Sequence, residues 1–192
     1  FDSLSISDSV TSAITNLSIY DLDDDIRSSK NIGWVLKHSD LMDVFFQEID
    51  NCDNIFFMNP QKLLQKKILF DYQFFCTGAN SLDKKIINFI DIKKSYNQSC
   101  LTFKVSLRGN CEKRAYEIFR KEGPLALLPL ENNLYQVIWT SSTIKSIERL
   151  NSDKNFLLDN LSTILPAQFK LDQIIGEFNI FPVSLSLNFS LL

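Results

Sequence analysis

The sequence predicts an α+β fold, in which an antiparallel or mixed sheet packs on helices, and three observations support this prediction. Residues 101–107 alternate apolar and polar side chains, which is the pattern of a half-buried strand. Residues 124–140 have the composition of a β-hairpin. Residues 143–165 contain two stretches with apolar residues three and four positions apart, the spacing of one helix face, and Pro166 lies just beyond the second.

The first 25 residues predict one or two strands that lead into an acidic turn. Leu4 and Ile6 alternate with serines, as in a strand with one apolar face. The acidic run at 21–25 lacks the spaced oxygen ligands and the glycine of a calcium loop, so we expect a solvated turn.

The next stretch predicts a helix that begins with Ser39 as its N-cap. Five apolar residues form one stripe along it: Leu41, Met42, Phe45, Phe46 and Ile49. Residues 55–58 are four apolar residues in a row, which predicts a short buried strand. Further strands are predicted within residues 61–76.

The middle of the chain predicts four consecutive strands, at 101–107, 115–119, 125–130 and 134–140. Gly123-Pro124 is turn chemistry, because glycine accepts a positive φ and proline fixes φ at about −65°. Short connections between consecutive strands predict an antiparallel meander.

The last part of the chain predicts two helices and a closing extended segment. The helices are expected at 143–150 and 153–165, capped by Ser142 or Thr143 and by Ser152. Residues 174–192 complete the chain in extended conformation.

Composition and charge narrow the function classes. The chain of 192 residues is 45% hydrophobic and carries a net charge of −3 with both signs mixed, so no nucleic-acid partner is expected. No apolar run is long enough to span a membrane, and a cytoplasmic protein is expected. The four cysteines show no CxxC spacing and His38 is the single histidine, so no metal site is expected. Because the chain opens with Phe1 directly before strand-like sequence, we expect a fragment of a longer protein.

The hairpin carries a family resemblance. Its sequence is Gly-Pro-Leu-Ala-Leu-Leu-Pro-Leu at 123–130, a polar turn, and then an alternating strand that ends in Trp139-Thr140. This stretch resembles the aromatic-ring hydroxylases of ubiquinone biosynthesis, which are similar to 2-polyprenyl-6-methoxyphenol hydroxylase and are FAD-dependent class A monooxygenases. The resemblance covers most of the chain, loosely before residue 30 and well from residue 100 onward.

A second stretch, Thr77-Gly78-Ala79-Asn80-Ser81 with Lys84 three positions later, is similar to a strand-turn motif of these flavoproteins. There a glycine turn brings backbone N–H groups near the flavin diphosphate. Thr77 stands where the family has Asp, and Lys84 stands where it has Arg, a change that keeps the charge but loses the bidentate fork. The resemblance also places His38 near the flavin. The implied FAD-binding residues are therefore His38, Thr77, Gly78, Ser81 and Lys84.

The resemblance further implies an organisation and a substrate. Residues 1–30 and 91–192 would form the substrate-binding sheet and its helices, and residues 31–90 part of the FAD domain. No GxGxxG occurs, so this segment alone is expected to retain no FAD and to be inactive. The cofactor would carry the chemistry with NAD(P)H and O₂, and no catalytic side chain is assigned. The apolar residues Ala126, Leu128 and Leu130 would line the site of an apolar, prenylated phenolic ring, which implies peripheral association with a membrane surface.

Two other interpretations stay open at the level of sequence. Ser39, Thr77 and Lys84 replace residues that the family would have, which favours a non-catalytic descendant that binds an isoprenoid or quinone. The third interpretation is an unrelated α+β interaction domain.

Overall fold

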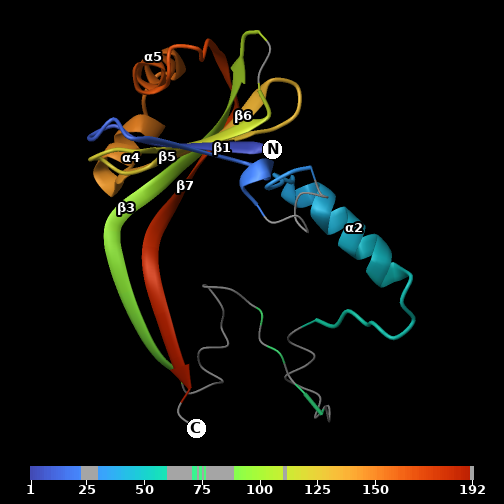
Figure 1. Ribbon diagram of the computed structural model, residues 1–192. Helices are drawn as coiled ribbons and strands as arrows, with labels where there is room; N and C mark the ends of the chain where they lie inside the picture. Colours follow the sequence, from blue (N-terminus) through green and yellow to red (C-terminus); the bar gives the residue numbers. More distant parts are fainter. Residues whose placement is uncertain are drawn as a thin grey trace. The chain divides into compact units, whose positions relative to one another are not determined.

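The computed structural model describes residues 1–22, 30–59, 71–72, 74, 76, 89–109 and 112–190 of the chain (Figure 1). The chain divides into two compact units, residues 1–35 with 93–186 and residues 36–92 with 187–192. The first contains most of the sheet and both helices that pack on it.

The fold is α+β, as predicted, and is built on a seven-stranded mixed sheet with the order β2-β1-β4-β5-β6-β3-β7 (Figure 1). The strands are β1 (Ser3–Asp8), β2 (Ile14–Ser18), β3 (Phe89–Leu107), β4 (Arg114–Phe119), β5 (Leu125–Pro129), β6 (Leu134–Ser142) and β7 (Leu171–Ser190). A short 3-10 helix, η1 (Ile19–Asp21), follows β2. β1 pairs with β4 in parallel, whereas β1–β2, β4–β5, β5–β6 and β3–β6 are antiparallel.

The predicted meander is wrong in one respect, because β3 does not pair with β4. It pairs with β6 instead, from Gln98–Ser142 to Ser106–Leu134, and β1 occupies the edge of β4. The strands β4, β5 and β6 follow one another through hairpins, and β3, which precedes them in the chain, lies beside the last of them; this is a Greek-key order. Alternation defines which face a residue occupies but not which strand lies next to it, so the sequence pattern could not reveal this crossover.

The two predicted helices, α4 (Thr143–Leu150) and α5 (Lys154–Ile164), are confirmed. The Ser142 side chain accepts a hydrogen bond from the backbone N–H of Lys145 at 3.4 Å and caps α4. The predicted cap Ser152 is wrong. Asp153 caps α5, since its carboxylate accepts from the backbone N–H groups of Asn155 at 2.8 Å and Phe156 at 3.4 Å.

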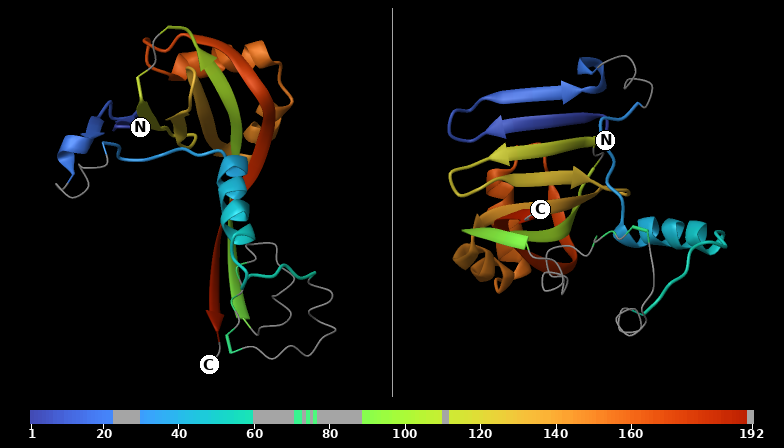
Figure 2. Two further views of the ribbon diagram at one scale, coloured as in Figure 1. Left: turned by 90° about the vertical axis from the view of Figure 1, so that its right-hand side faces the viewer. Right: turned by 90° about the horizontal axis from the view of Figure 1, so that it is seen from below.

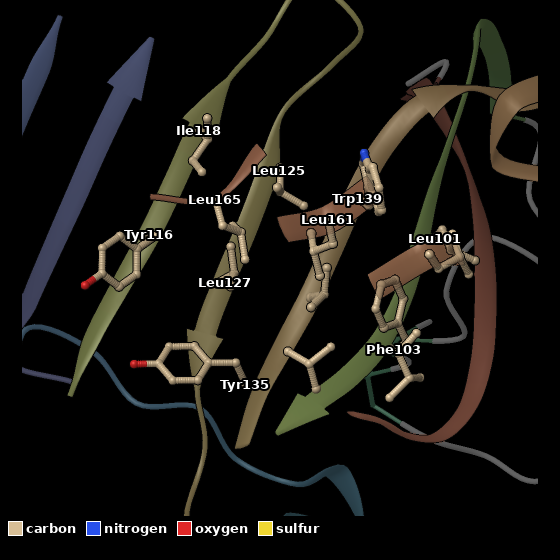
Figure 3. Packing of buried hydrophobic residues seen from close by; sticks show 14 of the residues in the cluster. Leu101, Phe103, Tyr116, Ile118, Leu125, Leu127, Tyr135, Trp139, Leu161 and Leu165 are labelled. Carbon is tan, nitrogen blue, oxygen red and sulfur yellow. The ribbon is translucent and has the colours of Figure 1, made fainter. Parts of the chain in front are cut away.

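The core lies between α5 and one face of the sheet (Figure 2, Figure 3). Alternate residues of β3, β4, β5 and β6 point into it, and α5 adds Leu157 and Leu161 from one side of the helix. The largest fully buried side chains are Trp139, Tyr135 and Phe103. The predicted face of Tyr135, Val137 and Trp139 is therefore the covered face of β6.

The second unit contains α2 (His38–Asp50), which confirms the predicted helix but not its start. Its N-cap is Lys37 rather than Ser39, and Ser39 donates to the carboxylate of Asp40 within the first turn. The predicted buried strand at 55–58 is also wrong, because these residues form no strand and their side chains are exposed. An apolar run becomes a strand only where a neighbouring strand accepts its backbone hydrogen bonds.

Candidate functional site

The candidate site is the face of the sheet opposite α4 and α5, which we call the outer face. Side chains alternate along β5, so Leu125 and Leu127 enter the core while Ala126 and Leu128 lie on the outer face, half-buried. Figure 3 shows the same one-sided arrangement, since the labelled Leu125 and Leu127 both belong to the core. Two of the three predicted substrate-lining residues therefore share a face that α5 does not cover.

The pairing register places five residues of the outer face in one row across neighbouring strands. Glu117 on β4 lies between Ile6 on β1 and Ala126 on β5, and the row continues to Ile138 and Thr102: Ile6, Glu117, Ala126, Ile138 and Thr102. Because adjacent strands lie about 4.8 Å apart, the row is about 19 Å long. All five side chains are half-buried, so they are neither core residues nor fully solvated.

The neighbouring row contains Leu128, Gln136 and Lys104. Gln136 is held against the sheet, since its side-chain Nε2 donates to the carbonyl oxygens of Phe103 at 3.0 Å and Val137 at 3.2 Å. The third predicted lining residue, Leu130, follows β5, and its N–H donates to the carbonyl oxygen of Leu134 at 2.8 Å, closing the hairpin turn. The outer face of β5 and β6 is thus mainly apolar, with its amide group already engaged.

Glu117 is the carboxyl group in the row that runs through Ala126 and Ile138, and it was not predicted from the sequence as a site residue. Burial raises the pKa of Glu117, and the structure gives this carboxyl no hydrogen-bond or ion-pair partner among the described residues. The signal was present in the sequence, because the alternation of residues 115–119 already separates Glu117 from the core residues Tyr116 and Ile118. What the sequence could not show is that Ala126 is its neighbour.

A second polar group lies around Glu122, in the turn between β4 and β5. Its carboxylate accepts hydrogen bonds from Arg149 at 2.8 Å and Arg120 at 3.3 Å, and Lys145 forms an ion pair with it at 2.9 Å. Burial alone would raise the pKa of Glu122, but the hydrogen bonds and charges of Lys145 and Arg149 outweigh it and lower the pKa to about 2. The side chains of Arg120, Glu122 and Arg149 are mostly buried and carry Trp139 beside them, which is the arrangement of a structural ion cluster.

The residues that the resemblance assigns to FAD are not brought together by the described structure. His38 is the first residue of α2 and is exposed. Thr77, Gly78, Ser81 and Lys84 lie outside the described residues. Their role in binding the cofactor therefore stays a prediction.

No three His, Cys, Asp or Glu side chains among the described residues are grouped closely enough to hold a metal ion. No helix in the described part of the chain has the length and apolar character needed to cross a membrane.

No protein-family model matches the chain, and no curated protein matches it. Among solved structures, one similar chain is the crystal structure of CmlS, a flavin-dependent halogenase, with a TM-score of 0.37 and 18% sequence identity. The match covers 53% of this chain and 20% of the halogenase chain, so this chain spans only a small part of that protein.

Proposed function

We propose that the chain is the central, substrate-binding portion of an FAD-dependent monooxygenase that hydroxylates a prenylated or otherwise apolar phenolic ring. NAD(P)H and O₂ would be the co-substrates. The observation that supports this most is the outer face of β4, β5 and β6, which offers apolar side chains around a single carboxyl group. An apolar surface with one polar group is what an aromatic ring with one hydroxyl requires.

The two faces of the sheet differ in a way that supports a ligand site on the outer face. The core face is filled by α5, so the outer face is the side on which a ring can lie. Ala126 and Ile138 occur side by side in the central row and carry no charge. Such a surface favours a prenylated ring over a carboxylated one, because a carboxylate would lose its hydration there without gaining a cation.

The cofactor side of the proposal rests on the residues that resemble the flavin motif. Gly78 permits close approach of the backbone, and Ser81 and Lys84 supply a hydroxyl and an ammonium group, which are donors that diphosphate oxygens accept. When bound, FAD would supply the oxidising chemistry. The chain's own residues would bind the ring, orient it and exclude water.

Binding of an apolar phenol tests the substrate half of the proposal. We expect 2-prenylphenol to bind this chain, as measured by isothermal titration calorimetry, and Leu128→Glu to weaken binding at least about tenfold by placing a charge on the outer face. Ile144→Glu is the matched control, since Ile144 is a 72% exposed apolar residue on α4. Equal effects of the two substitutions, or no binding by the wild type, would contradict the proposed site.

Flavin affinity tests the cofactor half. In the whole enzyme, Thr77→Asp with Lys84→Arg should tighten FAD binding about ten- to a hundredfold, because one charge-assisted hydrogen bond contributes about 1.5–3 kcal/mol. The measurement is the flavin dissociation constant of the wild type and the double variant at one ionic strength. An unchanged constant would favour the non-catalytic isoprenoid-binding interpretation.

A further inference from the structure

We propose that Glu117 is the hydroxyl-binding residue of the outer face, accepting a hydrogen bond from a phenol whose ring lies on Ala126 and Ile138. This inference rests on the proposed function, in that it assumes an apolar phenolic ligand on this face. It adds the residue that recognises the hydroxyl group, which the family resemblance does not assign.

Glu117 lies beside two apolar residues of the outer face. The register pairs Glu117 with Ala126 and Ala126 with Ile138, so the carboxyl and the two apolar residues occupy successive strands of one row. Alanine has no side-chain atom beyond Cβ, so no longer side chain at position 126 separates Glu117 from Ile138. Two strand spacings of about 4.8 Å each match the width of an aromatic ring with its hydroxyl group.

The Glu117 carboxyl has no protein partner among the described residues. It is half-buried, so its contact with water is reduced but not lost, and a donor from the protein would normally compensate for this. In the described part of the chain, Glu117 has none, and its burial between Ile6 and Ala126 raises its pKa without any compensating donor. A bound phenol would supply the O–H donor that this carboxyl lacks.

The charged side chains nearest to Glu117 on the outer face do not pair with it. Asp8, which pairs with Phe119 on the same face, is already engaged, because its carboxylate accepts from the backbone N–H groups of Val10 at 2.7 Å and Thr11 at 3.3 Å. Lys104 lies in the adjacent row and on β3, three strands away from β4. Among the described residues of the sheet, Glu117 therefore has no nearby cation to pair with, and an ionised carboxylate there accepts hydrogen bonds but repels other carboxylates.

Selectivity for the hydroxyl group follows from this chemistry. An ionised carboxylate forms a charge-assisted hydrogen bond with a phenol, which is stronger than a bond between neutral groups. The same charge disfavours a benzoate at this position. Glu117 would therefore select phenols over both carboxylated rings and rings without a hydroxyl group.

A comparison of two ligands tests the inference directly. We expect the wild-type chain to bind 2-prenylphenol about tenfold or more tightly than prenylbenzene, which has the same apolar part but no hydroxyl group. Glu117→Leu should reduce the affinity for 2-prenylphenol to that for prenylbenzene, while leaving prenylbenzene binding unchanged or slightly tighter. Glu117→Gln, which has nearly the same shape, should give an intermediate preference and guards against loss of folding in the leucine variant.

The outcomes separate this inference from the proposed function. If both ligands bind the wild type equally, and neither Glu117 variant changes their ratio, Glu117 does not recognise the hydroxyl group although the outer face still binds the ring. If neither ligand binds, the proposed function is overturned and this inference with it. The comparison within the wild type needs no substitution, so it remains decisive even if a variant does not fold.

Discussion

Arg149 stacks on Trp139, with its guanidinium carbon 4.1 Å from the centroid of the indole ring, and at the same time donates to Glu122 at 2.8 Å. One side chain of α4 thereby joins the end of β6 to the turn that precedes β5. Trp139 is 1% exposed and lies among the core residues in Figure 3. The contact with Arg149 therefore joins the ion cluster to the hydrophobic core. A cation over an aromatic face is stabilising, and more so where water is excluded.

Arg149→Met should destabilise the protein by about 2–4 kcal/mol, because it removes the stacked cation and leaves Glu122 with fewer donors in a mostly buried site. Arg149→Lys should have a stability between those of the wild type and Arg149→Met, since the ammonium keeps the charge but cannot stack in the same way. The measurement is the free energy of unfolding from denaturant titration. Arg108→Met is the control, because the Arg108–Asp172 pair has the same distance of 2.8 Å but an Arg side chain that is 71% exposed. We expect it to cost about 1 kcal/mol or less.

Glu122 should make stability depend on acid pH. Its pKa is lowered from 4.5 to about 2 in the folded protein, so the unfolded chain binds the proton first as the pH falls. The contribution of Glu122, on the order of 2–3 kcal/mol, is therefore fully present above about pH 5 and is lost between pH 4.5 and pH 2. Unfolding titrations of the wild type and Glu122→Gln at several pH values measure this difference. A gap between the two proteins that stays constant down to pH 2 would contradict the assigned pKa.

Gly123 should tolerate no side chain, unlike Gly109. Both have positive φ, of 134° and 92°, which strains any other residue. A Cβ at Gly123 would lie 2.6 Å from the carbonyl oxygen of Thr140, whereas a Cβ at Gly109 has nothing within 4 Å. We therefore expect Gly123→Ala to lower the free energy of unfolding by about 3 kcal/mol or more, and Gly109→Ala by about 1 kcal/mol. Similar melting temperatures of the two variants would show that the contact with β6 is not rigid.

The sequence predicted those parts of the fold that depend on local periodicity. The alternation at 134–140 correctly separated Tyr135 and Trp139 from Gln136, and the helical spacing correctly located α4 and α5. Pairing between distant strands could not be predicted in the same way. The contact of β3 with β6, and the parallel contact of β1 with β4, depend on packing of the whole sheet rather than on any one segment.

In the candidate site, too, the features set by local alternation were predicted, and those set by strand pairing were not. Ala126 and Leu128 were predicted to share a face, and β5 places both on the outer face. Glu117 was not predicted as a site residue, because only the register with β5 shows that its carboxyl lies beside Ala126. The residues at 77–84 lie outside the described part of the chain, so their assignment to FAD still rests on the resemblance alone.

Leu127 and Leu128 are adjacent on β5 but lie on opposite faces of the sheet. Substitution of Leu127 should mainly affect stability, and substitution of Leu128 should mainly affect ligand binding. Leu127 is fully buried in the core, so Leu127→Ala should cost about 2–5 kcal/mol through lost burial and a residual cavity. Leu128 is half-buried on the outer face, so Leu128→Ala should lower the free energy of unfolding by only about 1 kcal/mol.

For binding of 2-prenylphenol, Leu128→Ala should have the larger effect of the two substitutions. The affinity should fall about three- to fivefold in this variant, because apolar contact area with the ring is lost. Leu127→Ala should leave the affinity of the folded protein nearly unchanged, since its side chain does not reach the outer face. Denaturant titration gives the free energy of unfolding of each variant, and calorimetry gives its affinity for 2-prenylphenol. A larger loss of affinity in Leu127→Ala than in Leu128→Ala would contradict binding on the outer face.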